Sequence, residues 1–77
     1  MKALTEYIAK SLVEHPEEVL VDEIRFGSRV TLELHVAKDD MGRVIGRGGR
    51  VANAIRTLLR VAAERDGSQV TLDVVEP

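Results

Sequence analysis

The stretch "VIGRGGRVANAI" at residues 44–55 sets three glycines and two arginines directly before an apolar repeat. Glycine allows the backbone to adopt a positive φ and lets another backbone approach closely. The helix predicted from residue 50 begins with unpaired N–H groups and a partial positive charge, which suit a phosphate. A plain turn between two helices does not require this combination. The stretch therefore indicates an anion-binding loop at the start of a helix.

Positive charge gathers around this loop, although the 77-residue chain carries a formal net charge of −2. Residues 41–65 hold six arginines and one glutamate, which gives +5. The remaining residues hold five bases and twelve acids, which gives −7. A polyanion at close range meets the local charge, because salt screens charges farther than about 10 Å. A basic patch for a polyanion is one interpretation, and a solvated helix face is the other.

Length and composition place the chain among folded proteins with one domain, residues 1–77. Hydrophobic residues make up 44% and charged residues 31%. There is no cysteine, which excludes disulfides, thiolate metal sites and thiol catalysis. No apolar run approaches the ~20 residues of a membrane span, and the N-terminus lacks a signal-peptide core. We therefore expect a cytoplasmic protein without a membrane partner.

The first half of the chain predicts a helix followed by two strands. In residues 3–14, Leu4, Ile8 and Leu12 recur every fourth residue and form one helical stripe. His15-Pro16 is expected to end this helix. Residues 18–37 contain the alternating apolar residues Val30, Leu32, Leu34 and Val36. That period of two predicts a strand with one buried face, and Gly27-Ser28 suits a hairpin turn before it.

The second half predicts two helices and a last strand. Asp39-Asp40 is a helix-capping signal for a short helix over roughly 40–46. A strong helix over 50–65 ends at Asp66-Gly67, and "QVTLDVV" at 69–75 alternates as a strand. The order is α-β-β-α-α-β. It predicts the α+β class, with a three-stranded mixed sheet and the helices packed on one face.

Enzyme chemistry does not fit the motifs in this chain. The glycines do not match the phosphate loop G-x-x-x-x-G-K-[ST] or the dinucleotide fingerprint G-x-G-x-x-G. His15 and His35 lie far apart, and adjacent carboxylates such as Asp22-Glu23 point to opposite sides in a strand. No set of base, nucleophile and oxyanion donors is visible. We therefore expect neither an enzyme, nor a metal site, nor a cofactor.

The stretch "VIGRGG" matches the V-I-G-x-x-G core of KH domains, and Gly46-Arg47-Gly48-Gly49 corresponds to the GXXG loop. Two strands precede the motif and one follows, which resembles the type II KH order. The resemblance covers nearly the whole chain, including "YIAKSLVEHPEEV" at residues 7–19. Motif, element order and length together resemble the stand-alone bacterial KH-domain proteins of the KhpA (YlqC) type.

This resemblance implies a single-stranded RNA-binding protein whose GXXG loop clamps the backbone of about four nucleotides. Arg43 and Arg50 would lie near the phosphates. Val44 and Ile45 would form part of an aliphatic groove, and strand two would supply the other wall. The implied RNA-binding residues are Arg43, Val44, Ile45, Gly46, Arg47, Gly48, Gly49, Arg50, Val36 and Lys38. The chain has one Tyr and one Phe, so a stacking platform of sheet aromatics cannot form.

The resemblance also implies partners and a physiological setting. By this resemblance the protein would be an RNA chaperone or regulator. It would form a homodimer or pair with a Jag/KhpB-type KH protein. Its physiological role would concern cell shape, division and envelope growth. A second hypothesis is a protein–protein adaptor with a KH fold and weak RNA affinity. The basic loop favours RNA binding, whereas the acidic pI of about 5.6 favours the adaptor.

The helix over 50–65 carries a wide apolar arc that predicts self-association. A helix lying on a sheet needs an apolar stripe of only somewhat more than ~100°. One edge of the arc should therefore remain uncovered in a single subunit and form a dimer interface, unless the first helix covers it. We place Leu59, flanked by alanines, at that uncovered edge.

Overall fold

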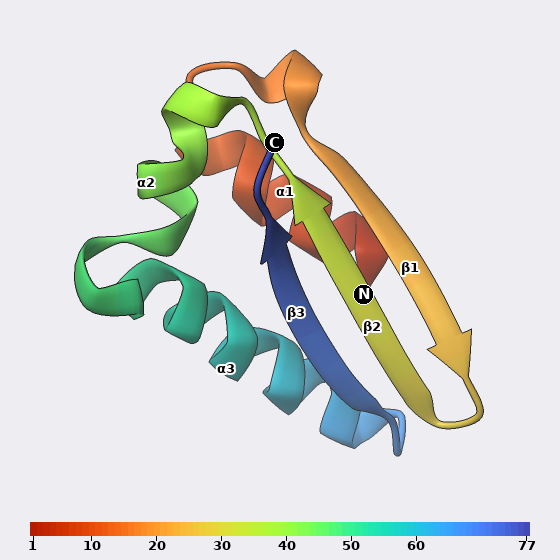
Figure 1. Cartoon of the computed structure of the whole chain (residues 1–77). Coiled ribbons are helices and arrows are strands. Elements are labelled where there is room, and N and C mark those ends of the chain that lie inside the picture. The colour runs from red at the N-terminus through yellow and green to blue at the C-terminus, as the bar shows by residue number, and fades with distance from the viewer.

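The protein folds into a three-stranded sheet with its α-helices on one face (Figure 1). The computed structural model describes residues 1–77. The α-helices and strands, in chain order, are α1 (Lys2–Leu12), β1 (Leu20–Phe26), β2 (Arg29–His35), α2 (Met41–Ile45), α3 (Arg50–Arg65) and β3 (Gln69–Val75). Short 3-10 turns occupy Pro16–Glu18, Lys38–Asp40 and Arg47–Gly49. The predicted α+β class and the order α-β-β-α-α-β are confirmed.

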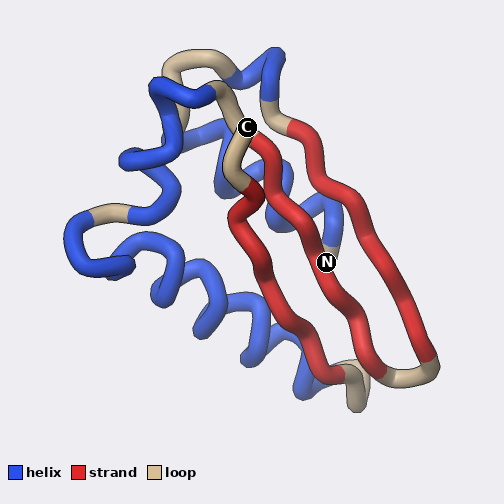
Figure 2. The backbone as a smooth tube through the Cα atoms, viewed as in Figure 1, coloured by secondary structure: helices blue, strands red, loops and turns tan.

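The sheet is mixed, as predicted, with β2 in its centre (Figure 2). β1 pairs antiparallel with β2 through a hairpin turn at Gly27-Ser28, where Gly27 has a φ of 62°. A glycine with positive φ at the first turn position is typical of a type II′ hairpin. β3 pairs in parallel with β2, so that Leu32 lies opposite Leu72. This pairing requires the chain to cross over through α2 and α3 between the two strands.

The core lies between the sheet and the helices. Val30, Leu32, Leu34 and Val36 are all buried, which confirms the alternation predicted for this segment. Their neighbours in sequence point to the opposite, open face of the sheet. The other core side chains come from β1, β3 and all three α-helices: Val21, Leu72, Ala9, Val44, Ile55 and Leu59. Each helix is therefore positioned by contact with the same apolar face.

The buried side of α1 differs from the predicted leucine stripe. Leu4 and Leu12 are 40% and 39% exposed, whereas Thr5 and Ala9 are fully buried. The Thr5 hydroxyl donates a hydrogen bond to the Met1 carbonyl at 2.9 Å, which satisfies it inside the core. The smaller side chains let the helix approach the sheet closely. α1 also ends at Leu12, earlier than predicted, because Val13 is already extended.

α3 has the predicted bounds, but the placement of Leu59 at an uncovered edge is wrong. Leu59 is completely buried, together with Ala52, Ile55 and Ala63, whereas Leu58 and Val61 are 56% and 53% exposed. Both alanines are therefore on the buried side of α3, together with Leu59. The helix ends as predicted, with Ser68 N–H donating to the Ala63 carbonyl at 3.0 Å and Gly67 at a φ of 69°. No helix of the protein has the length and apolar character to span a membrane.

Candidate nucleic-acid interface

The loop between α2 and α3 has a backbone that only glycine adopts readily. Gly46, Gly48 and Gly49 have φ values of 74°, 62° and 82°. Gly46 combines its positive φ with a ψ of 173°, a region that is essentially restricted to glycine. A Cβ atom on Gly46 would lie 2.5 Å from Val51 Cγ2, so the residue also needs the space. The loop therefore passes against the first turn of α3.

The N-terminus of α3 is open at this loop. Gly49 occupies the cap position, and no side chain accepts a hydrogen bond from the first N–H groups of the helix. Arg47 and Arg50 are exposed, and neither forms an ion pair within the protein. The backbone N–H groups of Gly49 and Arg50 donate to the carbonyls of Gly46 and Arg47. The positive end of the helix dipole and the two unneutralised guanidinium groups therefore make this loop electropositive. This arrangement suits a phosphate group.

Asp40 stands at the N-terminus of α2, but its carboxylate does not cap that helix. Asp40 Oδ1 and Oδ2 instead accept hydrogen bonds from the backbone N–H groups of Glu14 and His15, each at 3.0 Å. Burial alone would raise the pKa of Asp40. The two N–H donors, with the electrostatic effects of His15 and Arg43, outweigh burial and lower this pKa below its ordinary value. The predicted capping residue therefore ties the segment after α1 to the start of α2.

Arg43 also contacts Asp40 and Glu14, so it is not a free cation beside the loop. Its Nη2 donates to Glu14 Oε1, and its Nε lies 3.3 Å from Asp40 Oδ1. Two carboxylates already balance its charge. The resemblance implied that Arg43 lies near the phosphates, whereas the structure uses it to brace α2.

Two of the residues implied to line the groove are buried instead. Val36 and Val44 are 5% and 0% exposed and belong to the hydrophobic core. Their side chains pack in the core, and they line neither of the surface hollows of the protein. Ile45 and Lys38 do meet in one surface hollow, which is also lined by Met41 and the C-terminal residues Glu76 and Pro77.

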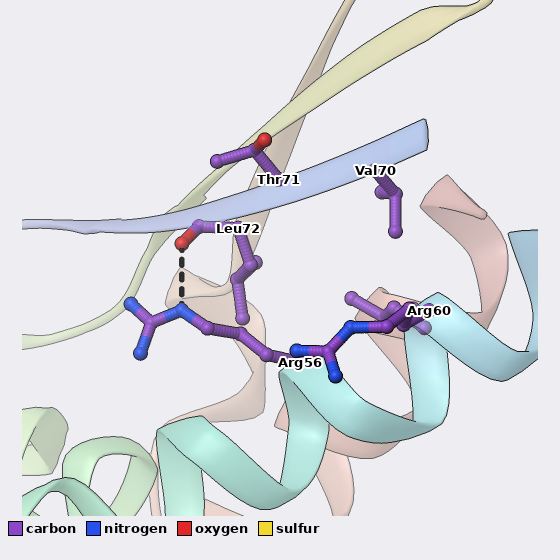
Figure 3. A pocket seen from close by; sticks show the side chains of 6 residues that line it. Arg56, Arg60, Val70, Thr71 and Leu72 are labelled. Carbon is purple, nitrogen blue, oxygen red and sulfur yellow. Dashed lines mark hydrogen bonds between the residues drawn. The ribbon is translucent and has the colours of Figure 1, made fainter. Parts of the chain in front are cut away.

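A second hollow lies between α3 and β3 (Figure 3). Its lining residues are Arg56, Leu59, Arg60, Val70, Thr71 and Leu72. Together the two hollows follow the free edge of β3 and the chain beyond it. The resemblance implied that the end of strand two supplies the second wall of an RNA groove. The strand that lies beside α3 and lines this hollow is β3, because its parallel pairing with β2 puts it at the edge of the sheet.

Histidine and carboxylate groups from two paired strands also meet on the open face of the sheet, and no local sequence pattern predicted this cluster. Asp22, Glu33 and His35 bring their ligand atoms within 4.8 Å of one another. The pairing of Asp22 with Glu33 across β1 and β2 creates this cluster. These groups are exposed or half-exposed, and such groups are common on protein surfaces without a metal. The cluster lies on the face opposite the helices, so it is not part of the glycine loop.

Comparison with known proteins is consistent with this geometry. The family model described as KhpA/KhpB, KH domain matches residues 2–74. The chain is 48% identical to RNA-binding protein KhpA of Clostridium acetobutylicum over 75 residues, which cover 97% of this chain and 100% of that protein. It is 45% identical to the protein of the same name from Halalkalibacterium halodurans, over 99% of this chain and 100% of that protein. The chain therefore belongs to the KhpA/KhpB family of KH domains.

Proposed function

We propose that the protein binds single-stranded RNA and grips the RNA backbone with residues 46–49. The main support is the loop geometry, in which three glycines at positive φ lead into an uncapped helix N-terminus beside Arg47 and Arg50. Relatives that match nearly the whole chain are named RNA-binding proteins. The resemblance extends the proposal to an RNA chaperone or regulator in the cytoplasm.

The arrangement of the groove supports a binding mode without aromatic stacking. Tyr7 lies on α1 and Phe26 at the hairpin end of β1, and neither lines the hollows beside the loop. The bases would instead meet apolar side chains such as Ile45 and Met41, together with polar groups along β3. Backbone contacts therefore contribute most of the affinity. A purely adaptor role is the second candidate, favoured only by the acidic pI.

Salt dependence tests whether the RNA backbone dominates binding. For single strands, log affinity falls against log salt concentration by about 0.7 for each phosphate that the protein neutralises. With two free arginines at an open helix end, we expect about two to four neutralised phosphates, and hence a slope of about −1.4 to −2.8. Titration of a fluorescent oligonucleotide at several salt concentrations gives this slope. An affinity that does not change with salt would contradict a phosphate-gripping loop.

We further propose that the protein self-associates through the exposed side of α3. Ala54, Leu58 and Val61 recur at i, i+4 and i+7 and form one apolar stripe facing solvent. This stripe lies on the edge of the apolar arc away from Leu59. A small domain has a thin core, so burying the stripe across a two-fold axis would also add to stability. The same stripe could serve a second KH protein of the KhpB type as partner.

Leu58→Asp tests this interface without disturbing the core, because Leu58 is 56% exposed. We expect the parent to show a monomer–dimer equilibrium in sedimentation analysis and the variant to remain monomeric, since a charge would be buried at the interface. Ser11→Asp adds the same charge to the exposed surface of α1 and should leave dimerisation unchanged. A parent that stays monomeric up to hundreds of micromolar, about the range of weak association, would refute self-association.

A further inference from the structure

Arg56 is held rigidly in the floor of the groove between α3 and β3. Its Nε donates to the Leu72 carbonyl at 3.1 Å, and its Nη1 donates to Asn53 Oδ1 at 3.0 Å. Figure 3 shows the guanidinium reaching across from α3 to the edge of β3, with its terminal nitrogens directed away from Val70 and Arg60. Two bonds from two sides fix both the position and the plane of the group.

The position of Arg56 is continuous with the glycine loop. Gly49, Asn53, Arg56 and Arg60 follow at helical spacing and form one stripe along α3. Gly49 lies next to Asn53, since a Cβ on the glycine would be 3.7 Å from Asn53 Nδ2. Arg56 comes seven residues after Gly49, or about 10 Å along the helix axis. An RNA strand gripped at the loop and laid along β3 therefore reaches Arg56 with one of its next bases.

The held guanidinium keeps hydrogen-bond donors free for a ligand. A guanidinium has five N–H groups. The bonds to Leu72 and Asn53 use two of them, and Arg56 makes no ion pair with any carboxylate. The free donors belong to the terminal nitrogens and lie in one plane with fixed spacing. Such a fork matches two adjacent acceptors better than one.

We propose that Arg56 selects the base at one position of the bound RNA, and that it prefers cytosine or guanine. Cytosine carries O2 and N3 side by side on its pairing edge, and guanine carries O6 and N7 on its major-groove edge. On these edges of adenine and uracil, a donor lies next to each acceptor. A guanidinium fork therefore meets only one acceptor there. This inference rests on the RNA-binding function proposed above and specifies which RNA the site prefers.

Binding of short RNAs that differ at one position tests the proposal. The probes are an all-uridine hexamer and hexamers in which one uridine is replaced, position by position, by cytidine, guanosine or adenosine. We expect one position at which cytidine or guanosine raises the affinity of the parent at least about fivefold over uridine or adenosine, the low end for a bidentate base contact. Arg56→Lys keeps the charge but not the fork, so it should bind the all-uridine probe and lose this preference. Arg65→Lys, at the far end of α3 and outside both hollows, is the matched control and should retain the preference.

The outcomes separate this inference from the proposed function. Equal affinity of the parent for every hexamer would overturn base selection by Arg56 and leave RNA binding intact. An Arg56→Lys variant that weakens all hexamers by the same factor would show that Arg56 only positions β3. Failure of every hexamer to bind would overturn both proposals. If Arg56→Lys does not fold, Asn53→Ala keeps Arg56 but frees its guanidinium, and it should reduce the ratio between cytidine and uridine probes.

Discussion

The double substitution Arg47→Asp and Gly48→Asp is expected to abolish binding to short single-stranded RNA while the protein stays folded. It replaces one cation by an anion and adds a second anion at the open N-terminus of α3, where we place a phosphate. Hydrogen bonds to charged groups contribute about 1.5–3 kcal/mol each. Loss of two such bonds, with repulsion added, should weaken the free energy of RNA binding by at least about 3 kcal/mol, or more than ~100-fold in affinity.

The fold should survive because both positions are free of tertiary contacts. A Cβ on Gly48 would meet nothing within 4 Å, and its φ of 62° with ψ of 20° is left-handed helical backbone, which Asp tolerates better than most residues. Arg47 is exposed and forms no ion pair. Fluorescence anisotropy measures RNA binding, and circular dichroism checks the fold. Arg65→Asp, at the other end of α3, makes an equal change in charge to that at Arg47 and should bind RNA almost as the parent does. If the double variant binds as tightly as the parent, residues 46–49 are not the RNA contact.

Gly46→Ala is expected to cause a large loss of stability, whereas Gly48→Ala should cause a small one. An alanine at position 46 must adopt the glycine-only backbone region, which costs about 1–3 kcal/mol, and its Cβ would lie 2.5 Å from Val51 Cγ2 and 2.8 Å from the Val51 backbone nitrogen. Relieving that overlap adds about 1–3 kcal/mol. At position 48 the space is open, and only the left-handed backbone costs about 1–2 kcal/mol. Urea denaturation of the two variants and the parent gives the free energies of unfolding.

Comparing Gly46→Ala with Gly48→Ala distinguishes a glycine that the fold requires from a glycine that mainly keeps the loop accessible. Gly46→Ala should also lose RNA affinity, because relieving the overlap displaces the loop from the first turn of α3. Gly48→Ala should keep most of its affinity. Equal free energies of unfolding for the two variants would show that the contact between Gly46 and Val51 does not constrain the loop.

Much of the fold could be predicted from local sequence patterns. The alternation of Val30, Leu32, Leu34 and Val36 identified the central strand, since only one face of that strand is buried. The bounds of α3 followed from its glycine-rich start and from the glycine that ends it. The GXXG motif located the loop, because positive φ at three positions demands glycine. Signals of this kind are local and do not depend on which elements meet in space.

The rest depended on tertiary contacts that no local pattern records. The apolar arc of α3 is wide enough for either edge to face the protein interior, and the buried edge is the one that carries Ala52, Leu59 and Ala63. The position of Asp40 predicts a cap for the helix that follows it, yet its carboxylate accepts hydrogen bonds from N–H groups 25 and 26 residues earlier. The sequence places Arg56 on the polar face of a helix, and its hydrogen bond to the Leu72 carbonyl depends on β3 forming the edge of the sheet. Each of these outcomes depends on a partner that is distant in sequence.

The parallel pairing of β3 with β2 determines when the groove becomes available during synthesis. The β1–β2 hairpin closes through a two-residue turn, so it can pair early, whereas β3 must wait until the whole crossover through α2 and α3 has left the ribosome. Before that moment Leu72 offers no carbonyl to Arg56. A nascent chain can therefore expose its basic loop before it has a second wall against which to hold a base. The ability to discriminate between RNAs arises late, with the last strand, and not gradually as the loop emerges.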